Sequence, residues 1–164
     1  MTGPLCNRII FILSLAGSGV ALLMTLAHAK LVSLPCGPSQ GCEYVALHPA
    51  AQGLGIPGLQ SIPTAVFGLG MYLFLVAISF LRVANPDESR NSKLPLIQLA
   101  VSITGVVISG WLTYLEAFVI HHWCRYCVAS AIIILLICIT AIIEQLNRSR
   151  GPFVPASLPD GELS

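Results

Sequence analysis

Residues 127–143 read CVASAIIILLICITAII, an uninterrupted apolar run that begins at the second cysteine of the pair Cys124 and Cys127. A helix needs roughly 20 apolar residues to cross a hydrocarbon core about 30 Å thick, and this run approaches that length. Because the apolar runs of this chain lack the strict alternation of a transmembrane barrel, we predict an all-α integral membrane fold, a bundle of four helices. The expected helices cover about residues 9–29, 62–81, 94–120 and 124–146.

The composition agrees with a membrane protein. Hydrophobic residues make up 55% of the 164 residues and charged residues only 9%, with a mean hydropathy of +0.85. A soluble domain of this size carries far more charge, and a net charge of +1 gives no indication of a nucleic-acid partner. We expect one membrane domain over residues 1–150, followed by a disordered cytoplasmic tail over residues 151–164.

The basic residues predict the orientation of the bundle. Six of the eight Lys and Arg residues flank the same helix ends: Arg8, Arg82, Arg90, Lys93, Arg148 and Arg150. The positive-inside rule makes these ends cytoplasmic, together with both chain termini. The loop over residues 30–61 then shares the opposite, oxidising face with the turn before the fourth helix. Its apolar residues and glycines favour a lid over the helix ends, with a loop resting on the lipid interface as the alternative.

The first apolar stretch also admits a second interpretation, as a signal peptide, because Ala27-His28-Ala29 resembles a cleavage site. Its apolar run exceeds the usual 7 to 15 residues of such a peptide, and its small residues suit close helix packing. We therefore expect a retained helix. The cysteine loop stays outside in either case.

The sequence Cys124-Arg-Tyr-Cys127 is the sharpest local motif. Two intervening residues let both sulfurs meet within one turn, and the positive end of a helix dipole favours a thiolate there. Zinc accepts two thiols with the neighbouring His121 and His122, but adjacent histidines rarely reach the same ion, so we predict no metal. A redox pair and a structural disulfide both remain open at this point.

A second pair occurs in Cys36-Gly-Pro-Ser-Gln-Gly-Cys42. Two glycines and a proline make this segment able to close on itself or to swing one cysteine toward the other pair. Two pairs on one oxidising face indicate a relay for electrons, with two plain structural disulfides as the alternative.

Together these features resemble the vitamin K epoxide reductase family, in its compact bacterial form without a fused thioredoxin domain. The resemblance covers roughly residues 9–146. It includes the order of the two cysteine pairs, with the widely spaced Cys36 and Cys42 (the wide pair) before the closely spaced Cys124 and Cys127 (the tight pair). That order separates the chain from the unrelated bacterial quinone-linked disulfide oxidase, which has its tight pair in the first external loop. Further matching positions are Gly55-Ile56-Pro57, Phe67-Gly68 and Tyr72.

The resemblance implies a quinone-dependent thiol–disulfide oxidoreductase that supports disulfide formation in secreted proteins. Cys36 would meet a separate thioredoxin-like thiol protein of the periplasm or lumen, and Cys42 would pass the electrons to Cys124. Cys127 would be the thiolate that contacts a quinone of the ubiquinone or menaquinone type. The expected location is the bacterial inner membrane with the cysteines facing the periplasm. Two alternatives stay open, namely reduction of vitamin K or another quinone epoxide with thiol electrons, and a non-enzymatic four-helix scaffold.

The predicted contacts with the quinone are His48, Thr64, Phe67, Trp111 and Tyr114. By resemblance, His48 stands where the family commonly has serine or threonine, and Thr64 stands where vertebrate members have an asparagine. Trp111 and Tyr114 can stack on a quinone ring, although aromatic packing inside a bundle is commoner.

Two further residues lie within expected helices. Glu116 is near the outer end of the third helix, and a carboxylate deep in lipid costs a few kcal/mol. We expect it to reach the interface, with a place in the cavity lining as the alternative. Cys138 follows Cys127 on the fourth helix about 16 Å deeper, too far to join the relay directly.

Overall fold

The computed structural model describes residues 3–29, 31–32, 63–85, 93–121 and 123–149. Cys36, Cys42 and His48 lie outside these residues. The described part forms the helices α1 (Gly3–His28), α3 (Thr64–Ala84), α5 (Leu94–Leu115), the π-helix η3 (Glu116–Ile120), which continues α5, and α6 (Arg125–Ser149).

The described residues contain 4 helical segments that are long and apolar enough to cross a membrane. They are Pro4–His28, Thr64–Ala84, Leu94–Val119 and Arg125–Ser149. The predicted all-α bundle of four membrane-spanning helices is therefore confirmed.

The helix ends reflect local sequence. Pro63 directly precedes α3, and Pro95 lies in the first turn of α5. The first N–H groups of a helix form no intrahelical hydrogen bonds, so a proline there costs none. Helix α1 begins at Gly3, earlier than residue 9, where the expected helix starts. Its polar first turns are accommodated because the Asn7 side chain donates a hydrogen bond of 3.0 Å to the Ser79 carbonyl oxygen.

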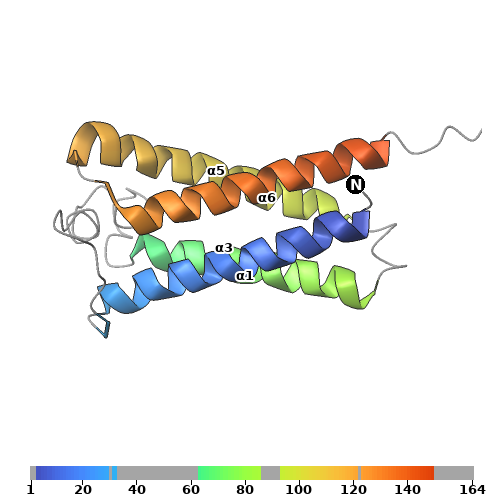
Figure 1. Ribbon diagram of the computed structural model, residues 1–164, viewed down its shortest axis with the longest axis horizontal. Coiled ribbons are helices and arrows are strands. Elements are labelled where there is room, and N and C mark those ends of the chain that lie inside the picture. The colour runs from blue at the N-terminus through green and yellow to red at the C-terminus, as the bar shows by residue number, and fades with distance from the viewer. Residues whose placement is uncertain (1–2, 30, 33–62, 86–92, 122, 150–164) are drawn as a thin grey trace, which may run out of the picture.

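The four helices lie side by side along a common direction (Figure 1). Helix α1 packs along α3 and α6, and α5 packs along α6, whereas the contact between α3 and α5 is slighter. One end of the bundle brings together the end of α1, the start of α3, η3 and the start of α6 (left in Figure 1). The described residues that flank residues 33–62 therefore lie at the same end as Cys124 and Cys127.

Tyr72 joins three helices in the core. Its ring approaches Gly17 of α1 so closely that a Cβ atom there would lie 2.3 Å from Tyr72 Cε1. Its hydroxyl donates a hydrogen bond of 2.9 Å to the Ser130 carbonyl oxygen on α6. The glycine thus allows the close approach of α1 and α3 that the small residues of the first apolar stretch indicate.

A buried polar network occupies the opposite end of the bundle. Arg82 of α3 forms an ion pair with Glu144 of α6, and each side chain is only 2% exposed. Arg82 also donates a hydrogen bond to Gln98 of α5, whose Nε2 donates to Ser79 Oγ at 2.7 Å. Arg82, one of the residues on which the orientation prediction depends, therefore points into the bundle.

Candidate functional site

The tight cysteine pair lies at the start of α6. Cys124 precedes the helix and is 1% exposed, whereas Cys127 in the first turn is half-buried. The backbone N–H of Cys127 donates a hydrogen bond to Cys124 Sγ over 3.3 Å. The amide at the helix start thus faces the Cys124 sulfur, where it stabilises a thiolate when one forms.

Glu116 reaches this pair because of the way α5 ends. The helix widens into η3 at Glu116, and His121 then adopts a left-handed conformation with φ of 56°, which reverses the chain. Short π-helical turns such as η3 are frequent at functional sites. The Cys124 N–H donates a hydrogen bond of 3.1 Å to Glu116 Oε2, so the return of the chain directly fixes the carboxylate.

The Glu116 side chain is buried, with 1% of its surface exposed. The expectation that it reaches the membrane interface is therefore wrong, and the alternative, a place in the cavity lining, is confirmed. The physical reason is the hydrogen bond from Cys124, which together with the neighbouring thiols gives the carboxylate a polar surrounding inside the bundle. Its second oxygen, Oε1, has no hydrogen-bond partner among the described residues.

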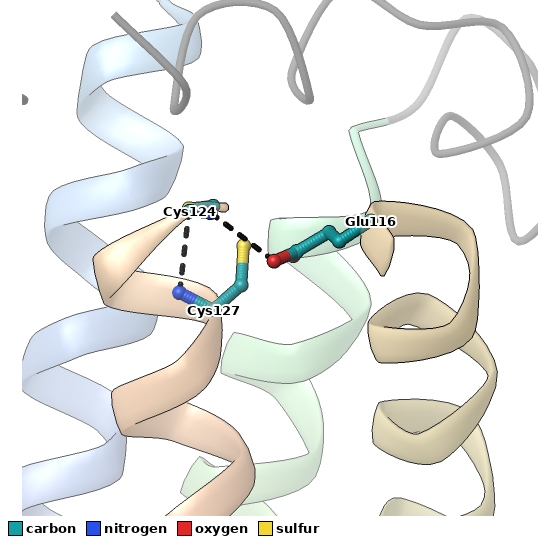
Figure 2. A group of neighbouring side chains, drawn as sticks. All are labelled: Glu116, Cys124 and Cys127. Atoms are coloured by element: carbon teal, nitrogen blue, oxygen red, sulfur yellow. Dashed lines mark hydrogen bonds between the residues drawn. The ribbon is translucent and has the colours of Figure 1, made fainter. Parts of the chain in front are cut away.

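Glu116, Cys124 and Cys127 form a compact group in which one carboxylate oxygen and the two Sγ atoms lie within 4.8 Å of one another. Figure 2 shows the Cys127 sulfur pointing toward the Glu116 carboxylate. His121 is exposed and is not part of this group, and His122 lies outside the described residues.

An apolar cavity of about 430 Å³ lies against this group. All four long helices contribute to its lining, which is mostly apolar with a few polar side chains, and Glu116, Cys124 and Cys127 border it. Small-molecule sites have this character, an apolar pocket with few convergent polar groups. The arrangement places the two cysteine side chains at the border of a cavity that suits a largely apolar ligand.

The predicted contact residues divide into two sets. Thr64 and Phe67 line the cavity. Trp111 and Tyr114 do not: they are 54% and 51% exposed on the outer side of α5. Their rings stack on each other with centroids 5.9 Å apart, and Tyr114 lies 5.0 Å from Phe118.

The part of α5 that faces the cavity has a simple helical spacing. Thr104, Ile108 and Leu112 recur every four residues and lead to Glu116, and all four line the cavity. Residues four apart lie on the same face of a helix. This spacing, counted back from the unusual carboxylate, is the signal that could have located the cavity face in the sequence.

The family model of the vitamin K epoxide reductase family matches residues 8–142, which is most of the chain and includes both cysteine pairs. No curated protein matches the chain.

Proposed function

The chain belongs to the vitamin K epoxide reductase family, and we propose that this oxidoreductase takes two electrons from a separate thioredoxin-like protein and passes them to a quinone. Its role would be to support disulfide formation in secreted proteins. The observation that carries the proposal is the position of the cysteine pair Cys124 and Cys127 at the border of an apolar cavity of about 430 Å³. The four apolar helices fit an integral membrane protein.

The proposed relay uses both cysteine pairs. Cys36 exchanges with the reduced partner, Cys42 passes the electrons to Cys124, and the disulfide between Cys124 and Cys127 is thereby reduced to the dithiol. Each transfer is a thiolate attack on a disulfide sulfur, so the two electrons move as a pair. The end of α1 and the start of α3, which flank residues 33–62, lie at the end of the bundle that holds the tight pair, which supports an exchange between the two pairs.

The quinone, of the ubiquinone or menaquinone type, would occupy the cavity and accept the electrons of the dithiol. Cys127 would face the ring, and Thr64 and Phe67 would contact it from α3. The apolar lining would exclude water from the reacting sulfur. We also propose that the cysteine end faces the periplasm of a bacterial inner membrane, since Lys93 and Arg148 belong to the opposite helix ends.

The test is turnover by the purified full-length protein in lipid nanodiscs. A reduced thioredoxin-like dithiol protein serves as the donor, and ubiquinone, menaquinone and vitamin K epoxide are offered separately. We expect quinol to form in a one-to-one ratio with donor disulfide. Turnover with the epoxide alone would contradict the proposal, and so would the absence of turnover with every acceptor.

The cavity can be tested with a matched pair of glycines on α3. Gly68 lines the cavity, and a Cβ atom there would meet nothing within 4 Å, so we expect the side chain of Gly68→Leu to occupy part of the cavity. We expect the KM for quinone to rise on the order of tenfold, equivalent to about 1.4 kcal/mol, with an unchanged thermal midpoint.

The control is Gly70→Leu, on the exposed side of the same helix and outside the cavity lining, where a Cβ atom also meets nothing within 4 Å. This variant should keep the parental KM. Equal changes in the two variants would show that the quinone does not bind in this cavity.

A further inference from the structure

Glu116 is buried beside the reactive cysteines, yet the relay of four cysteines leaves it without a role. Oxidation of a dithiol by a quinone moves protons as well as electrons. The two thiols lose two electrons and two protons as the S–S bond forms, and the quinone gains both to become a quinol. An apolar cavity excludes water, so a protein group has to carry the proton from the sulfur to the quinone oxygen.

The geometry of the carboxylate suits this task. Its Oε2 is held by the Cys124 N–H, which orients the group. Its Oε1 is buried and accepts no hydrogen bond from the described residues. An unsatisfied buried oxygen costs free energy, and one oxygen of this carboxylate lies within 4.8 Å of the Cys127 sulfur, which points at the carboxylate (Figure 2).

We propose that Glu116 is a catalytic residue that accepts the proton of the Cys127 thiol and delivers it to one oxygen of the quinone. This inference rests on the proposed function. Glu116 takes the proton from Cys127, the two sulfurs join as their electron pair passes to the quinone, and Glu116 then releases its proton to a quinone oxygen. The proton of Cys124 goes to the other oxygen, so that atoms and electrons balance.

Other titratable groups border the same cavity among the described residues: His28, Tyr72, Cys124, Tyr126 and Cys127. His28 belongs to α1, and its Nδ1 is hydrogen-bonded to the Met24 carbonyl oxygen at 2.9 Å. The Tyr72 hydroxyl is engaged by Ser130. Glu116 is the described carboxylate within 4.8 Å of both sulfurs, which makes it the better placed proton acceptor.

The test compares Glu116→Gln with the parental protein and needs no quinone for its first measurement. The amide oxygen of glutamine can still accept the hydrogen bond from Cys124, but the side chain no longer titrates. Alkylation of Cys127 in the reduced protein is followed by mass spectrometry as a function of pH, with Cys124 replaced by serine in every protein compared so that the second thiol adds no step of its own. We expect two steps in the parental profile, because thiol and carboxylate titrate as a coupled pair, and one step in Glu116→Gln.

The second measurement is quinone reduction. Loss of a general base typically costs 10²- to 10⁴-fold in rate, so we expect kcat of Glu116→Gln to fall by roughly that factor with little change in KM. The conservative variant Glu116→Asp should keep the two-step profile, which also guards against a glutamine variant that fails to fold. In His28→Gln the two steps should persist.

A single-step profile in both the parental protein and Glu116→Gln would overturn the assignment, and so would loss of the second step in His28→Gln alone. A lower thermal midpoint with an unchanged profile and unchanged kcat would show a structural role and overturn it as well. If the parental protein reduces no quinone, the proposed function fails, and the quinone fails as the destination of the proton. The alkylation profile still reports separately whether Glu116 is coupled to Cys127.

Discussion

Cys127→Ala is expected to abolish quinone reduction while the protein stays folded. The side chain borders the cavity and points at Glu116, so its loss removes the sulfur that would face the quinone. Removing a nucleophile that acts together with neighbouring groups typically lowers the catalysed rate by several orders of magnitude. We therefore expect turnover to fall on the order of 10³-fold or more. Because Cys127 is only half-buried, its truncation should leave the thermal midpoint within a few degrees.

The matched control is Cys138→Ala on the same helix. Cys138 is buried in the other half of α6, about 16 Å along the helix from Cys127. This variant removes the same atoms and should retain turnover, with at most a modest loss of stability. Turnover is measured with the dithiol donor and a quinone, and folding by thermal unfolding in the same nanodiscs. Retained turnover in Cys127→Ala would contradict the relay and favour a scaffold with structural cysteines.

The sequence predicts the membrane helices well because their signal is local. Length and hydropathy of each run suffice to identify a span, and the run over residues 127–143 lies within α6 as expected. The place of the tight pair at a helix start is equally local, since the apolar run begins at Cys127. No knowledge of the neighbouring helices is needed for either prediction.

Hydropathy alone does not predict which face of each helix points into the bundle. A helix that is apolar on all sides has no amphipathic pattern from which to read its inner face. Trp111 and Tyr114 are therefore plausible cavity residues in the sequence, whereas the structure places them on the outer side of α5. The π-helix at Glu116 adds a local change of helical phase that residue spacing does not show.

Long-range pairing is the other feature that the sequence conceals. Arg82 is a typical flanking arginine at the end of a transmembrane helix, and only the fold shows that it meets Glu144 of α6. The bond between Cys124 N–H and Glu116 likewise depends on a chain reversal at His121. A hydropathy profile shows each of these polar residues only as an interruption of an apolar run, and it does not show which residue is its partner.

The second large effect is expected for Glu144→Ala, at the end of the bundle away from the cysteines. Glu144 accepts hydrogen bonds from Arg82 and from Arg148, the latter at 2.9 Å. Its removal leaves the buried Arg82 guanidinium without the carboxylate that Glu144 supplies. Breaking a buried ion pair typically costs about 3–5 kcal/mol, and we expect the free energy of unfolding in nanodiscs to fall by about this amount.

Two controls separate the ion pair from the simple loss of side-chain atoms. Gln145→Ala truncates the neighbouring side chain, which is partly exposed, and should change stability by less than about 1 kcal/mol. Arg82→Met combined with Glu144→Met replaces the pair with apolar groups of similar size. Because such replacements are often neutral, this double variant should recover most of the loss.

Turnover per folded molecule should be unchanged in Glu144→Ala, because the network of Arg82, Gln98 and Glu144 shares no residue with the cavity lining or the cysteine pair. An equal loss of stability in Gln145→Ala, or no recovery in the double variant, would show that the ion pair is not the cause. A loss of turnover without a loss of stability would instead link the two ends of the bundle. Substitutions in the polar network are thus expected to lower the stability of the protein without lowering turnover, and substitutions in the cysteine pair are expected to do the reverse.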